Sequence, residues 1–218
     1  MTNTTNGRLD RTPRLLVIAV VMTALGLLSH SSTLTRGGER APSQARMARP
    51  IPPKPGYTGQ GALIRPEGYR EWIYVGTPIT PNDLNPPAAP LHEFHNVYIH
   101  PNDFEYWTKT GTFSDGTVIV AESVGVGSRK ATSGNGYFMG EFEGLEAAVK
   151  DSGRFKGEPG TWAYFSFGRT HPLTDTAEKL PAVSCNFCHR ANAGEDFVFT
   201  QYYPVLRAAK GIGDSARR

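Results

Sequence analysis

The stretch 115–127 reads DGTVIVAESVGVG, and it carries the strongest indication of the fold in this chain. It opens with an Asp-Gly pair, which is typical of a turn between strands. The residues that follow are mostly β-branched or small and apolar, as in strands that are buried on at least one side. We therefore expect a central strand here and look for its partners on both sides.

Three other segments resemble this one in composition. Runs rich in β-branched and aromatic residues, bounded by Gly, Pro or Asn, predict strands at 71–79, 95–100 and 160–168. Between them, Pro101 and early acidic residues followed by Gly111 predict a short helix.

Two segments are harder to assign. Residues 135–149 begin with an Asn-Gly turn, alternate large and small side chains, and then become helical in composition. Residues 196–210 fit either a strand or a short helix that is broken at Pro204. Taken together, the chain predicts a mainly β (α+β) domain, an antiparallel sheet with a few short helices.

The first 61 residues differ from this pattern. Residues 1–31 combine three arginines, the apolar run LLVIAVVMTALGLL and small polar residues, which is typical of an export signal. An uncleaved N-terminal anchor is the alternative, although a membrane span needs about 20 apolar residues. Residues 32–61 are rich in Pro and Arg and predict a flexible linker, which leaves a folded domain over 62–218. The net charge of +3 gives no reason to expect nucleic-acid binding.

The only two cysteines lie in the motif CNFCH at 185–189. A redox pair would use only the two thiols, and a structural zinc site would need one more ligand from elsewhere. Covalent haem attachment uses both thiols and the adjacent histidine as the axial ligand. Export also favours haem, because free thiols outside the cytoplasm tend to oxidise. We therefore expect one haem c, held by Cys185 and Cys188 with His189 on the iron.

The position of the motif excludes two common kinds of cytochrome. Only 29 residues follow His189 (190–218), and none of them is methionine. Small helical electron-transfer cytochromes have the motif near the N-terminus and a downstream Met ligand. Four-helix cytochromes have it near the C-terminus, but this chain is too rich in strand signals to be one.

Seven segments in order resemble the cytochrome P-460 family over residues 68–210. They are GYREWIYVGTPITPNDLN, NVYIHP, TGTFSDGTV, SGNGYFMG, GLEAAVKDS, CNFCH and VFTQYYPVLRAAK. The resemblance implies an exported, mainly β protein with one haem. It also implies a five-coordinate iron, with histidine on one side and an open pocket on the other. Members oxidise hydroxylamine, with nitric oxide as a substrate or product, and carry a lysine bonded to the porphyrin rim. The related beta-type cytochromes c-prime lack that bond and bind gases such as nitric oxide.

The resemblance also assigns residues around the pocket. Glu146 aligns with the distal carboxylate, His95 with a basic pocket residue, and Phe94 with an apolar wall. The cross-linking lysine aligns with Ala121, which has no amine. Lys130 is the nearest lysine along the chain and the first alternative for the cross-link.

Bland alternatives remain for several of these residues. Glu146 could be a solvated helix residue paired with Lys150, and His95 could close the sixth coordination position to make a pure electron carrier. The remaining candidates are expected on the surface or in the core: His92, His100 and His171 on the surface, and Met139 in a core strand.

Two functions therefore stand as expectations. One is a periplasmic oxidoreductase that acts on hydroxylamine or nitric oxide and passes electrons to a redox partner such as another cytochrome. The other is a gas-binding or electron-transfer protein without turnover, which Ala121 favours. The resemblance leaves a homodimer open as the oligomeric state, and membrane association is expected only if the N-terminal segment is uncleaved.

Overall fold

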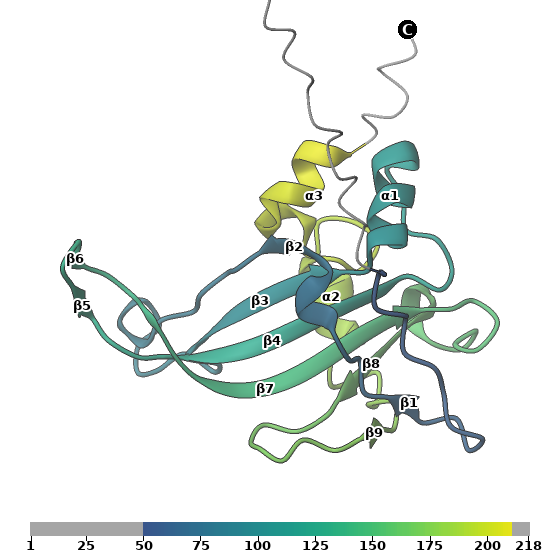
Figure 1. The fold of residues 1–218 in the computed structure, drawn as a ribbon, viewed down its shortest axis with the longest axis horizontal. Coiled ribbons are helices and arrows are strands. Elements are labelled where there is room, and N and C mark those ends of the chain that lie inside the picture. Colours follow the sequence, from purple (N-terminus) through teal and green to yellow (C-terminus); the bar gives the residue numbers. More distant parts are fainter. Residues whose placement is uncertain (1–49, 211–218) are drawn as a thin grey trace, which may run out of the picture. The chain divides into compact units, whose positions relative to one another are not determined.

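The computed structural model describes residues 50–210, and its centre is a five-stranded antiparallel sheet (Figure 1). The strand order is β2-β3-β4-β7-β8, so strands that follow one another in the chain also lie side by side. Their bounds are β2 Ile73–Gly76, β3 Glu93–Ile99, β4 Val118–Val126, β7 Met139–Lys150 and β8 Trp162–Ser166. The expected mainly antiparallel β fold with a few short helices is confirmed.

Shorter elements surround this sheet. Strands β1 (Leu63–Ile64) and β9 (Thr176–Ala177) pair with each other, while β5 (Lys130–Ala131) and β6 (Gly134–Asn135) form the tip of the long β4–β7 hairpin. The helices are α1 Pro101–Thr110, α2 Asn186–Asn192 and α3 Pro204–Ala209, with 3₁₀ turns η1 Tyr69–Glu71, η2 Asn82–Leu84, η3 Pro159–Thr161 and η4 Thr200–Tyr202. Within residues 50–210, none of the helices has the length and apolar character needed to span a membrane.

Strand alternation divides the core between the two faces of the sheet. On β4, Val118 and Val120 belong to one apolar cluster, and Ile119 belongs to the other. The first cluster lies under β1 and β9. The second is covered by α1 and α3, where Trp107 Nε1 donates a hydrogen bond to the carbonyl of Leu206 at 2.7 Å (Figure 1). We call the second side of the sheet the helical face.

The predicted strands β2, β3, β4 and β8 and the predicted helix α1 are all present. Helix α1 begins after His100, whose ring Nδ1 accepts from the amide of Asn102 at 3.3 Å, and ends at Gly111 with φ 69°. His100 is therefore a buried capping residue, 4% exposed, and not the surface histidine that the sequence predicted.

The helical reading of the end of segment 135–149 is wrong, because these residues continue β7. Leu145 and Val149 are buried on one face of the strand, and Glu146 points to the other. The strand pairs with β4 on one edge and β8 on the other. These two ladders satisfy the backbone and outweigh the modest helix preference of Glu and Ala.

The C-terminal segment differs from its prediction in a similar way. Pro204 does not break an element but occupies the first position of α3. Proline fits there because the first amides of a helix have no partner within the helix. The residues before it form η4 and a tight turn that bears on the site described below.

The ordered domain begins before Ala62. Lys54 Nζ donates to Asp103 Oδ1 and to the carbonyl of Gly116, both at 2.5 Å, and Tyr57 packs against the first apolar cluster. Residues 50–61, which were expected to be linker, therefore pack on the domain. The predicted signal over 1–31 and the linker residues 32–49 lie outside the described residues.

Candidate haem site

The motif CNFCH forms the start of helix α2. Cys185 immediately precedes the helix, and Cys188 and His189 lie within it. Asn186, between the two cysteines, is 1% exposed, and its Nδ2 donates to the carbonyl of Trp162 at 2.8 Å. This bond ties the motif to the start of β8. The sequence gave no reason to single out Asn186, because its role depends on a contact 24 residues away.

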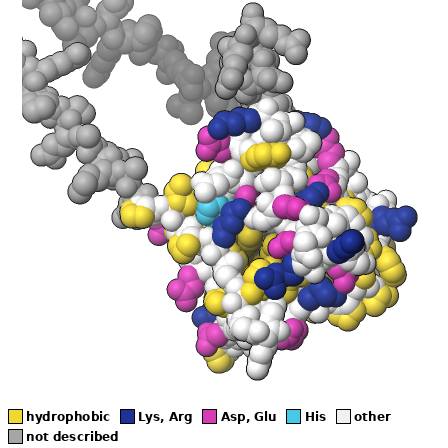
Figure 2. All heavy atoms as spheres, turned by 90° about the vertical axis from the view of Figure 1, so that its right-hand side faces the viewer, with side chains coloured by type: hydrophobic (Ala, Val, Ile, Leu, Met, Phe, Trp, Pro, Cys, Tyr) yellow, Lys and Arg dark blue, Asp and Glu magenta, His cyan; other side chains and the backbone are white. Residues whose placement is uncertain are grey.

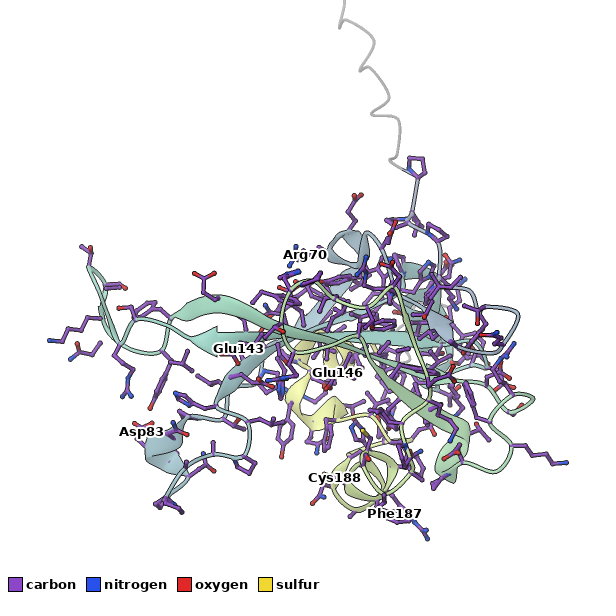
Figure 3. The ribbon with its side chains drawn as sticks, turned by 90° about the horizontal axis from the view of Figure 1, so that it is seen from below. Arg70, Asp83, Glu143, Glu146, Phe187 and Cys188 are labelled. Carbon is purple, nitrogen blue, oxygen red and sulfur yellow. The ribbon has the colours of Figure 1, made fainter. Side chains whose placement is uncertain are left out.

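The two thiols have different surroundings. Cys185 is half-buried and lines a pocket, and burial raises the pKa of its thiol. Cys188 is exposed on the outer side of α2, next to the exposed ring of Phe187 (Figure 3). Neither forms a disulfide. Within residues 50–210, no cluster of three or more His, Cys, Asp or Glu could hold a metal ion, so a zinc site at these thiols lacks ligands.

His189 is held as a neutral imidazole that presents one nitrogen. Its Nδ1 lies 2.7 Å from the carbonyl oxygen of Phe197, so Nδ1 carries the proton and Nε2 keeps its lone pair. The ring packs between Tyr164 and Phe199, with centroid distances of 4.5 and 4.6 Å. Burial lowers the pKa of His189, although the bond to Phe197 opposes this. A neutral histidine with a fixed tautomer is the form that binds a metal.

The pocket beside His189 lies on the helical face of the sheet. Its lining is mostly apolar and comes from β3, β4, β7, β8 and the C-terminal segments: Val97, Ile119, Ala121, Glu146, Ala147, Ala148, Tyr164, Phe165, Leu180, Cys185, His189 and Tyr203. An apolar slot with one thiol and one histidine at its edge fits a porphyrin, which is flat and hydrophobic. The residues present therefore fit a haem held through the CNFCH motif.

Glu146 is the one carboxylate in the pocket lining. It lies on β7 two residues from Ala148, about 7 Å along the strand, while Ala148 pairs across the sheet with Tyr164 beside His189. The side chain is exposed only in the sense that it opens into the pocket, because β4 and β8 flank it on both sides (Figure 3). Burial raises the pKa of Glu146, opposed by the positive charges of Arg169 and His95. The alternative pairing with Lys150 is excluded, because Lys150 instead binds Asp196.

An ionic cluster lies beyond Glu146 at the end of the pocket. Glu93, 1% exposed, accepts from Arg169 Nη1 at 3.1 Å, from His95 Nε2 at 2.7 Å and from Ser123 Oγ at 3.0 Å. Burial raises the pKa of Glu93, but these three hydrogen bonds outweigh it and the net shift is downward. Glu93 is therefore ionised and fixes both positive groups near Glu146. The sequence predicted His95 but missed Glu93 and Arg169, which are 76 residues apart.

Ala121 occupies the position in the pocket where the sequence placed it. It pairs with Val97 on one side and Glu146 on the other, so all three point to the helical face. Phe94 does not line the pocket, because it lies one residue from His95 on β3 and points to the opposite face. Lys130 is exposed on β5 at the hairpin tip and lines a different depression. No lysine of residues 50–210 lines the haem pocket.

The other predicted residues lie away from the pocket. His171 is exposed and stacks on Phe142, and the Nδ1 of half-buried His92 accepts from the amide of Asn82. Met139 was expected in the core, but it begins β7 with half its surface exposed. Within the described part of the chain, the pocket lining contains no methionine and no histidine other than His189.

The comparisons agree with this geometry. A family model described as cytochrome P460 matches residues 66–200, and a search of the curated proteins gives no match. The matched segment contains all five strands of the sheet, both cysteines, His189 and Glu146. It covers well over half of the chain and carries with it a haem cofactor. The chain therefore belongs to the cytochrome P460 family of haem cytochromes.

Proposed function

We propose that this protein is an exported cytochrome with one haem c, and that it binds and oxidises hydroxylamine or nitric oxide at an open iron position. Cys185 and Cys188 form the two thioether bonds, and His189 Nε2 is the axial ligand. Haem, when bound, supplies reversible electron transfer and a coordination position for a small nitrogen ligand. The observation that carries the proposal is a pocket with His189 on one side and Glu146 as its only ionisable group of opposite function.

The role of Glu146 follows from its surroundings. Oxidation of hydroxylamine removes protons as well as electrons, so the site needs a proton acceptor. Burial holds the pKa of Glu146 above that of an ordinary glutamate and closer to the working pH. Arg169 and His95 keep enough positive charge nearby for the carboxylate to ionise. Glu146 can thus accept a proton from a ligand and release it to solvent through the mouth of the pocket.

A second candidate function is supported by Ala121. The absence of an amine at this position, and of any lysine from the described pocket lining, supports a haem without a third covalent bond. The protein would then resemble the beta-type cytochromes c-prime, binding nitric oxide or transferring electrons without sustained turnover. The two candidates share the haem, the axial histidine and the open position, and they differ in the rate of hydroxylamine oxidation.

The location and partners follow from the same proposal. Thioether attachment at such motifs occurs outside the cytoplasm, which supports the predicted export signal and a periplasmic location. Net oxidation needs an electron acceptor, and another periplasmic redox protein would serve. Figure 2 shows acidic and basic side chains interspersed on one face of the domain, and this mixture does not favour nucleic acid as a partner.

The test begins with haem attachment. The mature protein should retain haem in a denaturing gel stained for peroxidase activity, and the Cys185→Ala, Cys188→Ala double variant should lose it. Haem that extracts freely from the wild type into acidified solvent would contradict the proposal. Steady-state oxidation of hydroxylamine, with nitric oxide binding measured on the same sample, then separates the two functions: binding with sustained turnover supports the first, and binding alone supports the second.

A further inference from the structure

The carbonyl that fixes His189 lies in an unusual turn. Glu195 and Val198 bond to each other through their backbones, and the two residues between them, Asp196 and Phe197, have φ of 42° and 63°. Positive φ at both central positions is typical of tight turns that use Asn-Gly or Asp-Gly. A phenylalanine at the second position is strained, so neighbouring residues must hold the turn in place.

Two side chains from the sheet hold it through Asp196. Lys150 Nζ donates to Asp196 Oδ2 at 2.5 Å, and Trp162 Nε1 donates to Asp196 Oδ1 at 3.3 Å. Lys150 and Trp162 are register partners on β7 and β8, and Lys150 is 18% exposed. A largely buried lysine therefore bonds a strained turn to the sheet, and nothing in the proposed chemistry uses it.

The neighbouring turn leaves room for the phenylalanine ring. A Cβ atom at Gly160 would lie 2.3 Å from Phe197, and Gly160 itself has φ 65°. The side chain of Phe197 is thus packed against backbone while its carbonyl points the other way, towards His189 Nδ1 at 2.7 Å. The hydroxyl of Tyr164 also donates to this carbonyl, at 3.4 Å.

We infer that Lys150 and Asp196 are positioning residues that set the strength of the hydrogen bond from His189 Nδ1 to the Phe197 carbonyl, and through it the reduction potential of the haem iron. This inference rests on the proposed role of His189 as the axial ligand. A stronger bond at Nδ1 makes the imidazole a better donor to the metal, and better donation stabilises the ferric state. The clamp therefore holds the potential low.

The test compares Lys150→Met with Lys109→Met in the haem-loaded protein. Lys109 pairs with Glu105 on the surface of α1, so it controls for the loss of one lysine and one ion pair. For each variant, resonance Raman of the ferrous form gives the iron–histidine stretching frequency, and spectroelectrochemistry gives the midpoint potential. Lys150→Met should lower the frequency and raise the potential, while Lys109→Met should match the wild type. Lys150→Arg should restore both values towards the wild type.

Two results would overturn the inference or its basis, and they can be told apart. A normal iron–histidine stretch in the wild type that is unchanged in Lys150→Met would refute the clamp. A wild type without such a stretch would instead refute the role of His189. If Lys150→Met does not retain haem, Asp196→Asn serves in its place, because asparagine tolerates positive φ and can still accept from Trp162 while losing the ionic bond. Wild-type values in Asp196→Asn would again refute the clamp.

Discussion

Replacing Arg169 by glutamine should show how strongly the ionic cluster supports the domain and the pocket together. Arg169 neutralises Glu93, which is 1% exposed, and breaking a buried pair typically costs about 3–5 kcal/mol. The arginine is 43% exposed, and Glu93 keeps its bonds to His95 and Ser123, so we expect a smaller loss of about 2 kcal/mol. A domain of this size loses roughly 2–4 °C per kcal/mol, which predicts a Tm lower by about 4–8 °C.

The assay is thermal unfolding of the haem-loaded protein at several pH values, with Arg129→Gln as the control. Arg129 pairs with Asp83 at 3.3 Å on the surface and should change stability by less than about 0.5 kcal/mol. Because the folded pKa of Glu93 is lowered, its stabilising effect is present above the pKa of an unfolded glutamate. That effect is lost as the pH falls through the folded value, so wild type and Arg169→Gln should converge in acid. Equal stability of Arg169→Gln and Arg129→Gln at neutral pH would refute the buried pair.

Three further predictions concern the pocket. Glu146→Gln should slow hydroxylamine oxidation about 100-fold, the low end for a lost proton acceptor because water can enter the open pocket, while Glu143→Gln, on the same strand but outside the pocket lining, should not. Equal rates in the two variants would contradict the role of Glu146. Wild-type turnover should rise with pH through the raised pKa of Glu146, and Arg169→Gln should move this rise to higher pH because it removes a positive charge; a shift to lower pH would contradict the assignment. Ala121→Lys, matured with haem, should gain a third covalent link, visible in the intact mass and as a red-shifted ferrous band, and an unchanged mass would show that this position does not reach the porphyrin.

The sequence predicted those parts of the fold whose signals are local. The β-branched run of β4 and the Pro and Gly at the two ends of α1 each determine a short element without help from distant residues. The end of β7 was missed because Glu, Ala and Leu favour helix, and only pairing with two neighbouring strands overrides that preference. The packing of residues 50–61 was missed for the same kind of reason, since it depends on contacts such as Lys54 with Asp103.

The site divides in the same way. Cys185, Cys188 and His189 were identified because their spacing alone specifies the chemistry, and Ala121 and Glu146 because a family resemblance fixed their register. Arg169 lies in a loop with no motif, so its approach to the pocket is visible only in three dimensions.

A single residue determined the one error in the predicted pocket. Phe94 was placed in the wall because it neighbours His95 in sequence, but adjacent residues of a strand point to opposite faces. A register shifted by one position thus exchanges a pocket residue for one on the far side of the sheet.

Electron paramagnetic resonance of the resting ferric protein tests the central claim most directly. The claim is that haem binds on His189 and keeps its other axial position open, because the described pocket lining offers no second histidine and no methionine. The account predicts a high-spin ferric signal. A low-spin signal from an iron with two protein ligands would contradict it, and would leave no position at which hydroxylamine or nitric oxide could bind.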